Sequence, residues 1–412
     1  MPDPFDALET RPPEQREEEQ FERLRAQLAD AQARARGPAG GFGDLDAQAV
    51  TDRAALAGLP VLRKADLAER QRAAPPFGGL AVEGLRHAFM SPGPIFEPGG
   101  DGPDWWRFGR ALHAAGLRRG MLVHNCFAYH LTPAGMMFEN GARAVGARVF
   151  PGGVGNTEAQ VEAAAHLRPE AWTGTPDFLK VILDKARDLG ADLSSIGLAL
   201  VSGGALFPSL RREYAERGVR CLQCYGAADL GLIAYETASA DGPHEGMVVD
   251  EGVILEILRP GTDQPAPEGE VGEVVATALN PDYPLLRFAT GDLSAFMPGP
   301  SPCGRTGPRI RGWMGRADQT AKIKGLFVRP EQIAEIARRH QEIAKARLSI
   351  HRVAQHDAFT LSVEADTQDA AFRDRVAESV KAVLRLSGRV EIVARGELPN
   401  DGKVIDDRRD PA

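Results

Sequence analysis

A chain of 412 residues is too long for one compact core, so two or three domains are expected. Its net charge of −8 argues against general binding to a nucleic-acid backbone, and no apolar run approaches the ~20 residues of a membrane span. The acidic, polar beginning, MPDPFDALET, argues against a secretory signal. Four cysteines without such a signal favour a reduced compartment, and we expect a cytoplasmic protein.

The first predicted element is an amphipathic helix over residues 14–36, which the glycines from Gly37 to Gly43 interrupt. From about 105 to 235, helical stretches alternate with short apolar runs. That alternation is typical of an α/β domain with a largely parallel sheet. The runs span 121–123, 147–150, 171–173, 198–202 and 219–224.

Residues 247–293 contain strands separated by Gly and Pro turns, which predicts a smaller β-rich subdomain. The C-terminal elements then follow the order of a small α+β unit. They are a helix at 330–340, strands near 347–353 and 358–364, a helix at 369–387 and a strand at 389–394. The predicted fold is therefore α/β, with a large N-terminal domain over residues 1–315 and a small α+β domain over residues 316–412.

Three segments carry residues suited to nucleotide chemistry. The first extends over 284–325, where an Arg-x-x-Thr-Gly-Asp turn ends at Asp292 and Gly315-Arg316-Ala317-Asp318 follows. An acid on a Gly turn can accept two ribose hydroxyls, and a downstream Arg can meet a phosphate or the same ribose. The second is Tyr225-Gly226-Ala227-Ala228-Asp229, and the third is the Pro…Gly-Lys loop that ends at Lys403.

Together the three segments resemble the adenylate-forming superfamily of acyl-CoA synthetases. The surroundings, including LPVLRKADL at 59–67, are most similar to its phenylacetate–CoA ligase branch. The resemblance implies an ATP-dependent, AMP-forming ligase that activates an aryl or related carboxylic acid as its adenylate and transfers it to the thiol of CoA. It also implies that residues 1–315 bind nucleotide and acid, and that residues 316–412 are a mobile lid with its hinge at Asp318.

The same resemblance assigns roles to single residues. Lys403 would contact both the reacting carboxylate and the α-phosphate, where negative charge gathers. Asp229 would hold the Mg²⁺ that bridges the ATP phosphates. The implied nucleotide-binding residues are Gly203, Gly204, Ala205, Tyr225, Gly226, Asp292 and Arg316.

Two further segments resemble the sequence motifs whose residues line the acid pocket in that branch. Residues 126–135 place Tyr129 and Thr132 there, and residues 172–178 place Thr175 and Pro176. Thr132 stands where the branch has Phe, and His130 replaces a Gly, so the identity of the acid stays open. The alternative that both segments belong to the hydrophobic core instead of the acid pocket also stays open.

Two departures from the family pattern concern the phosphates of ATP. Asp229 is shorter than the usual Glu, and residues 91–100, SPGPIFEPGG, replace a Ser/Thr/Gly-rich loop. Prolines remove backbone donors, and Glu97 would repel phosphate. Two alternatives therefore stay open: an adenylating enzyme with an acceptor other than CoA, and a non-catalytic protein that binds nucleotide or acyl groups.

Some members of the family carry a Cys/His zinc knot, for which the matching positions here are Thr237, His244, Ser301 and Cys303. At most two of these are zinc ligands and a structural zinc takes four, so no zinc is expected. Cys221-x-x-Cys224 has redox spacing but lies in an apolar run, which favours structural thiols. Dimers are common in the family, which makes a homodimer one candidate assembly.

Overall fold

The computed structural model describes residues 4–34, 45–80, 82, 85–92, 94–259, 262–319, 321–323, 326–353, 356–399 and 403–409. The predicted helix break at 37–43 and residues 400–402 of the predicted lysine loop lie outside the described residues. The chain divides into two compact units. The first unit comprises Met1–Gly204, Gly218–Thr290 and Ser294–Gly312. The second unit comprises Ala205–Arg217, Gly291–Leu293 and Trp313–Ala412. The domain boundary expected at 315/316 stays a prediction.

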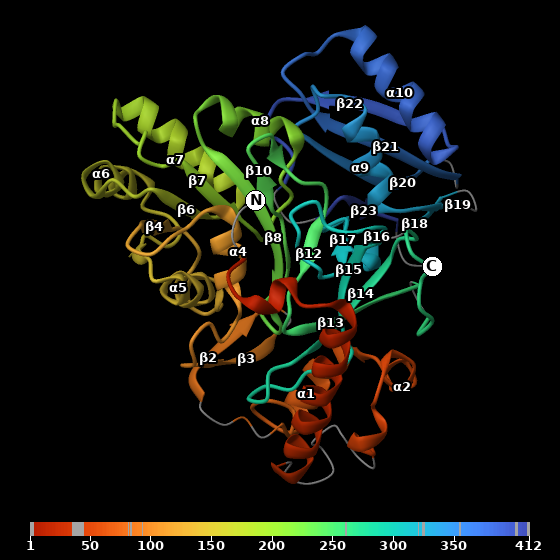
Figure 1. The fold of residues 1–412 in the computed structure, drawn as a ribbon. Helices are drawn as coiled ribbons and strands as arrows, with labels where there is room; N and C mark the ends of the chain where they lie inside the picture. The colour runs from red at the N-terminus through yellow and green to blue at the C-terminus, as the bar shows by residue number, and fades with distance from the viewer. Residues whose placement is uncertain are drawn as a thin grey trace. The chain divides into compact units, whose positions relative to one another are not determined.

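A nine-stranded sheet forms the centre of the first unit, with the strand order β16-β17-β12-β9-β8-β7-β6-β4-β5 (Figure 1). The five strands from β8 to β5 in this order pair in parallel, and the remaining pairs are antiparallel. The parallel strands are β4 (Leu122–Asn125), β5 (Arg148–Pro151), β6 (Ala171–Gly174), β7 (Leu198–Val201) and β8 (Arg220–Ala227). The others are β9 (Gly231–Tyr235), β12 (Met247–Val249), β16 (Phe296–Met297) and β17 (Arg309–Ile310).

Helices join the parallel strands, as the alternating pattern predicts, so the α/β fold class is confirmed. The helices α4 (Phe108–Ala115) and α5 (Ala134–Val145) pack against each other, as do α6 (Thr157–Leu167) and α7 (Pro176–Leu189). Gly141 makes the first of these contacts close, because a Cβ there would lie 2.6 Å from the Cβ of Phe108. The connection between β7 and β8 carries α8 (Pro208–Glu216).

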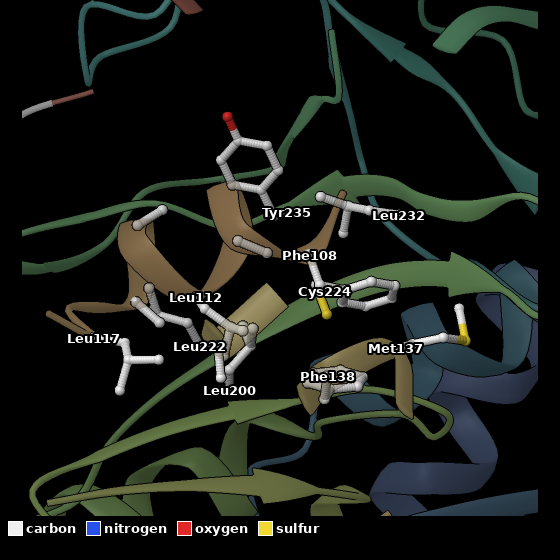
Figure 2. Packing of buried hydrophobic residues seen from close by; sticks show 14 of the residues in the cluster. Phe108, Leu112, Leu117, Met137, Phe138, Leu200, Leu222, Cys224, Leu232 and Tyr235 are labelled. Atoms are coloured by element: carbon white, nitrogen blue, oxygen red, sulfur yellow. The ribbon is translucent and has the colours of Figure 1, made fainter. Parts of the chain in front are cut away.

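The main core of the first unit lies where α4 and α5 meet the sheet. Phe108 and Leu112 project from α4 at the spacing of one helix face, towards Leu200 and Leu222 of the central strands (Figure 2). Phe138 of α5 joins this cluster, and its ring lies 4.5 Å from that of Phe108. This apolar packing fixes the helices on strands whose carboxyl ends carry the predicted binding residues.

A second sheet of the first unit has the order β1-β15-β14-β13. Its strands are β1 (Leu62–Arg63), β13 (Val253–Leu258), β14 (Gly272–Ala278) and β15 (Phe288–Ser294). The β-rich character predicted for residues 247–293 is thus confirmed. The predicted amphipathic helix is also confirmed as α1 (Pro13–Arg34), whose Phe21, Leu24 and Leu28 are buried against Ile254 of β13.

The second unit contains a four-stranded sheet with the order β22-β21-β20-β23 and its own core. The predicted strands and helices of this region are confirmed in type and order. They are α9 (Pro330–Arg338), β20 (Lys345–Val353), β21 (His356–Glu364), α10 (Ala370–Leu384) and β22 (Arg389–Val393). The unit also contains three strands that were not predicted, which are β18 (Ala321–Ile323), β19 (Leu326–Val328) and β23 (Ile405–Asp407). Apolar residues of α10 at helical spacing, such as Val376 and Val380, are buried against the sheet.

Short elements complete the described chain. They are η1 (Ala7–Thr10), η3 (Ala47–Ala49), α2 (Arg53–Ala57), α3 (Lys64–Ala73), β2 (Leu85–Ser91), β3 (Ile95–Gly100), β10 (Ala238–Ser239), β11 (Gly242–Pro243) and η4 (Ala317–Gln319). In the ranges given above, no helix combines the length and apolar character needed to cross a membrane.

Candidate active site

The predicted residues of the first unit follow the carboxyl ends of the parallel strands. Tyr129 and Thr132 come after β4, Thr175 and Pro176 after β6, and Gly203 and Gly204 after β7. Tyr225 and Gly226 form the end of β8 itself. Because the carboxyl ends of parallel strands share one edge of a sheet, where open α/β sheets bind their ligands, the fold brings these segments to one edge.

The turn after β7 joins two of these segments. Gly203 has a φ of +70°, a left-handed conformation that favours glycine. A Cβ on Gly203 would lie 3.7 Å from Cγ2 of Thr175, and one on Gly204 would lie 3.2 Å from Cδ of Pro176. The backbone oxygen of Gly204 accepts a hydrogen bond from Nε2 of Gln223 at 2.8 Å, which ties the turn to β8. Ala205, the last residue of the predicted segment, falls in the second unit.

Tyr225 is held in one position by its hydroxyl. Its Oη donates to Oγ1 of Thr290 at 3.1 Å, and Thr290 donates in turn to the backbone oxygen of Val274 at 3.0 Å. The side chain is 7% exposed. Gly226 lies where a Cβ would come within 2.8 Å of the backbone oxygen of Gly231, so a larger residue would push β8 and β9 apart.

The segment after β4 is organised around Asn125. Its Nδ2 donates to the hydroxyl of Tyr129 at 2.7 Å and to the backbone oxygen of Gly135 at 2.8 Å, while its Oδ1 accepts from Thr173 of β6 at 3.0 Å. Burial raises the pKa of Tyr129, so the phenol stays protonated at neutral pH. Thr132 is half-buried in the same loop, beside Leu131, whose side chain is 64% exposed.

The Asp292 turn belongs to the second unit. Its backbone pairs with Arg316 in an isolated bridge, and the Asp292 carboxylate lies 3.5 Å from Nη1 of Arg316. Nε1 of Trp313 donates to the same carboxylate at 3.0 Å. Gly291 has a φ of +75°, and a Cβ there would lie 2.9 Å from Nη2 of Arg316. Glycine therefore permits the close approach of the two residues that are predicted to bind ribose and phosphate.

Arg287, which opens the same turn motif, has a structural role. It is fully buried in the first unit and forms a two-pronged ion pair with Glu256, at 3.0 and 2.9 Å. It also donates to the backbone oxygen of Ala57 at 2.9 Å. Its donors therefore hold β13, β15 and the segment after α2 together.

Lys403 lies two residues before β23 in the second unit. Its side chain is 55% exposed, and its Nζ lies 3.7 Å from Oδ1 of Asp406. The segment is fixed by Oε1 of Gln319, which accepts from the backbone N–H of Val404 at 2.6 Å. Gln319 closes the turn η4, in which Asp318 is the central residue. The structure thus brings the predicted hinge turn beside the segment that carries the predicted catalytic lysine.

Asp229 follows β8 and is 5% exposed. Its Oδ2 lies 3.4 Å from Nζ of Lys64 at the start of α3. Neither carboxylate oxygen has a hydrogen-bond partner among the described residues. Burial raises the pKa of Asp229, and Lys64 partly opposes that shift. Carboxylate oxygens without a full hydrogen bond suit a hard cation such as Mg²⁺, so this residue fits the implied metal.

The part of the chain that the structure describes contains no group of three or more His, Cys, Asp or Glu side chains that could hold a metal ion. An Mg²⁺ ion at Asp229 would therefore draw most of its ligands from water and from ATP phosphates, as this ion commonly does.

The segment that replaces the phosphate loop forms a hairpin. Strands β2 and β3 pair antiparallel, with Met90 opposite Phe96 and Ser91 opposite Ile95. Gly93 lies outside the described residues. Glu97 points into the protein and is fully buried, a position that the sequence did not reveal.

The positions that match a zinc knot are joined by hydrogen bonds. Oγ1 of Thr237 lies 3.0 Å from Nδ1 of His244, and Oγ of Ser301 lies 3.0 Å from Sγ of Cys303.

The thiols of the Cys-x-x-Cys pair are structural in character. Cys221 and Cys224 are buried in β8, and burial raises the pKa of Cys224 to about 12. A protonated, buried thiol suits the structural role expected for that pair.

Sequence reasoning missed two sets of polar residues near the site. Lys64 belongs to the LPVLRKADL phrase, but nothing local indicated its contact with Asp229. His124, Cys126 and Gln160 form a buried cluster, in which Nε2 of His124 lies 2.8 Å from Oε1 of Gln160 and 3.2 Å from Sγ of Cys126. Burial lowers the pKa of His124 to about 4 and raises that of Cys126, so both are neutral at pH 7.

Comparisons with known proteins identify the proteins that this chain is similar to. Residues 108–278 match the family described as AMP-binding enzyme. The chain is 29% identical over 378 residues to a phenylacetate–coenzyme A ligase of Thermus thermophilus, with 83% of each chain covered. It is also 29% identical over 311 residues to a phenylacetate–coenzyme A ligase of Pseudomonas putida, which covers 71% of this chain and 70% of that protein.

The solved structures that resemble this chain are also CoA ligases. A 2-hydroxyisobutyryl-CoA ligase in its postadenylation state, in complex with 2-HIB-AMP, is 25% identical and has a TM-score of 0.82, covering 97% of this chain and 91% of that chain. An anthranilate CoA ligase in complex with anthranoyl-AMP, at 17% identity and a TM-score of 0.58, shares the fold over 79% of this chain and 67% of that chain.

The fold and these matches define an adenylate-forming enzyme. Residues 108–278 form an AMP-binding domain, the chain is similar over most of its length to phenylacetate–CoA ligases, and it is an AMP-forming acid–thiol ligase. The family and enzyme class predicted from the sequence are therefore confirmed.

Proposed function

We propose that this ligase activates an aryl or related carboxylic acid with ATP and then transfers the acyl group to CoA. In the first step, a carboxylate oxygen attacks the α-phosphorus of ATP, which releases pyrophosphate and leaves the acyl-adenylate. In the second, the CoA thiol attacks the acyl carbon, the bond to AMP breaks, and the thiol proton is lost. The observation that carries this proposal is the Asp292 turn, where an acid, an Arg and a Trp converge.

Each part of that turn suits nucleotide binding. The Asp292 carboxylate can accept hydrogen bonds from both ribose hydroxyls, because such an acceptor offers about four lone-pair sites. Trp313 orients it by a hydrogen bond of 3.0 Å. Arg316, which is about one-third exposed, can reach a phosphate or the ribose while it remains near Asp292.

The first unit would supply the adenine and acid sites. We assign the adenine to the turn of Gly203 and Gly204, where the absence of a side chain permits close approach of a flat base, and to Tyr225 and Gly226. Ala205 would complete that surface. We assign the acid to Tyr129, Thr132, Thr175 and Pro176. The closeness of Gly203 to Thr175 and of Gly204 to Pro176, where an added Cβ would lie 3.7 and 3.2 Å from their side chains, supports adjacent adenine and acid sites.

Lys403 would serve the first step. Its ammonium is a compact charge on a flexible stem, suited to the negative charge that gathers as the carboxylate attacks phosphorus. We further propose that residues 1–315 and 316–412 are separate domains and that the smaller one turns about Asp318 between the two steps. Such a rotation would let one acid site serve both reactions and would keep water from the adenylate.

Asp229 would hold Mg²⁺, which neutralises and orients the ATP phosphates when bound. The carboxylate of Asp229, which has an ion-pair partner in Lys64 but no hydrogen-bond partner among the described residues, supports this assignment. We expect no zinc at Thr237, His244, Ser301 and Cys303, a cytoplasmic location, and no nucleic-acid or membrane partner. A homodimer is one candidate assembly.

One observation favours a second candidate, a protein that binds nucleotide or acyl groups without catalysis. Pro92 and Pro94 lack the backbone N–H groups that could hold phosphate, and Glu97 is buried in the same hairpin.

Pyrophosphate release separates these functions. The full chain would be incubated with ATP, Mg²⁺ and single acids from an aryl and aliphatic panel, with and without CoA. We expect at least one acid to support pyrophosphate release and, with CoA, acyl-CoA formation. Pyrophosphate without consumption of CoA would point to another acceptor, and the absence of pyrophosphate with every acid would contradict an adenylating function.

Asp292→Ala is expected to weaken ATP and AMP binding by about 1.5–3 kcal/mol, the scale of hydrogen bonds to a charged acceptor. Isothermal titration calorimetry of the nucleotide measures this directly. Asp241→Ala, which removes an exposed carboxylate from a turn, is the matched control and should bind as the wild type does. An unchanged affinity of a folded Asp292→Ala variant would remove Asp292 from the nucleotide site.

A further inference from the structure

The glycine-rich turn between β5 and α6, residues 152–156, has no part in the proposed function. It follows the carboxyl end of β5, where Pro151 pairs with Asn125 of the parallel strand β4, so it lies at the same edge of the sheet as the acid and adenine segments. Gly153 and Gly155 have φ values of +68° and +75°, a left-handed conformation that favours glycine. Three of the five residues in the turn are glycines, which leaves open space at an edge where ligands are expected.

One glycine of this turn faces the segment that we assign to the acid. The backbone N–H of Gly153 donates to the backbone oxygen of Asn125 at 3.0 Å. A Cβ on Gly153 would lie 3.9 Å from the backbone oxygen of Phe127 and 4.0 Å from Cδ2 of Tyr129, which are distances of ordinary van der Waals contact. A Cβ on Gly155 would have no atom of the described residues within 4 Å. A side chain at position 153 would therefore lie next to the Tyr129 ring, whereas one at position 155 would not.

Phe127 connects this turn to the turn after β7. Its backbone oxygen is the atom that faces Gly153, while a Cβ on Gly203 would lie 4.0 Å from Cε1 of its ring and 3.7 Å from Cγ2 of Thr175. The side chain of Phe127 is 7% exposed, and its backbone N–H donates to Oδ1 of Asn125 at 3.2 Å. The turns after β5 and β7 therefore approach the same acid segments from two different strands.

Gln160 of α6 holds the turn from inside the protein. Its Nε2 donates to the backbone oxygens of Gly153 at 3.0 Å and Gly155 at 2.6 Å. Its Oε1 lies 2.8 Å from Nε2 of His124 and accepts from Sγ of Cys126 at 3.2 Å. Gln160 is 4% exposed and His124 is fully buried. Both ends of the amide are thus occupied, one by the turn and the other by the strand β4 and the residue that follows it.

We propose that this turn is a wall of the acid site, that Gly153 determines how large a group of the acid fits beside Tyr129, and that Gln160 is a positioning residue that holds the wall in place. The proposal rests on the assignment of Tyr129 to the acid in the proposed function. The atom of Tyr129 that position 153 meets is a ring carbon. The space that glycine leaves open therefore suits an uncharged group, such as the aryl ring or branched chain of a carboxylic acid.

Gly153→Asn and Gly155→Asn form a matched pair that tests this wall. Asparagine enters the left-handed conformation more readily than other residues with a side chain, and the two positions have similar φ values. Pyrophosphate release would be measured with the acid that the wild type uses best and with analogues that carry smaller and larger groups. We expect Gly153→Asn to lower kcat/KM for the largest acid by at least about tenfold more than for the smallest, the scale of a steric change in an apolar pocket. Gly155→Asn should keep the order of the acids.

Gln160→Leu tests the positioning role. The substitution removes the hydrogen bonds of the amide, so the turn loses its support from α6. We expect KM for the acid to rise and the order of the acids to change, while KM for ATP stays nearly unchanged. Glu162→Leu, at an exposed position of the same helix, is the control and should behave as the wild type does. Thermal unfolding identifies the folded variants, and the two asparagine variants decide the proposal if Gln160→Leu does not fold.

Equal losses for all acids in Gly153→Asn, or the same change of order in both asparagine variants, would overturn the proposal. Failure of Gly153→Asn to fold where Gly155→Asn folds would also overturn it, since position 153 would then serve only the turn. A wild type that releases pyrophosphate with no acid would overturn the proposed function and this wall together. An active wild type whose order of acids survives in Gly153→Asn would overturn the wall alone.

Discussion

Lys403→Ala is expected to lower the rate of adenylate formation by at least about a hundredfold, the scale seen when one group that stabilises a transition-state charge is lost. Thioester formation from supplied acyl-adenylate should stay largely intact, because the carboxylate has already reacted and the charge that Lys403 stabilises no longer develops. The two half-reactions are measured separately, by pyrophosphate release from ATP and acid, and by acyl-CoA formation from synthetic adenylate.

Two controls accompany this substitution. Lys381→Ala removes an exposed lysine from α10, in the same unit, and should leave both half-reactions unchanged. Lys403→Arg keeps the positive charge but not the compact ammonium, and should retain part of the adenylation rate. Equal losses in both half-reactions of Lys403→Ala would count against the role proposed for this lysine.

Asp318→Pro is expected to damage the two half-reactions unequally. Proline fixes φ near −65°, whereas a hinge residue must change its backbone angles. If the locked orientation is the one that forms the adenylate, adenylation should survive better than thioester formation. We expect the ratio of the two rates to change by more than about tenfold, or ~1.4 kcal/mol. The position of Asp318 in the turn η4, next to Gln319, motivates this choice.

Asp318→Asn is the matched control, because it removes the charge but leaves φ free. Its two rates should change together, if they change at all. A thermal unfolding curve for Asp318→Pro would show whether the turn still folds, since proline also restricts the residue before it. Parallel changes of both half-reactions in a folded Asp318→Pro variant would mean that Asp318 only shapes a turn.

Much of the fold could be predicted from the sequence, because the periodicities are local. The apolar spacing of Phe21, Leu24 and Leu28 identified α1, and short apolar runs separated by helices identified the parallel strands. The order of motifs along the chain was also sufficient to predict the enzyme family.

Contacts between distant segments could not be predicted in this way. Lys64 and Asp229 are 165 positions apart in the chain, and only the tertiary structure brings the helix α3 and the end of β8 together. Glu97 looked like a group that repels phosphate, because its sequence gives no sign that it is fully buried in the hairpin. Arg287 belongs to a motif associated with nucleotide binding, yet its partners are Glu256 and backbone oxygens.

The most direct measurement of the proposed chemistry follows oxygen atoms. An acid that supports pyrophosphate release would be labelled with ¹⁸O in its carboxylate and incubated with ATP, Mg²⁺, CoA and the full chain. Mass spectrometry of the products is expected to find one ¹⁸O atom in AMP and none in pyrophosphate, because a carboxylate oxygen attacks the α-phosphorus and stays with AMP when the thiol displaces it. Unlabelled AMP, or label in a phosphate released together with ADP, would contradict activation through an acyl-adenylate.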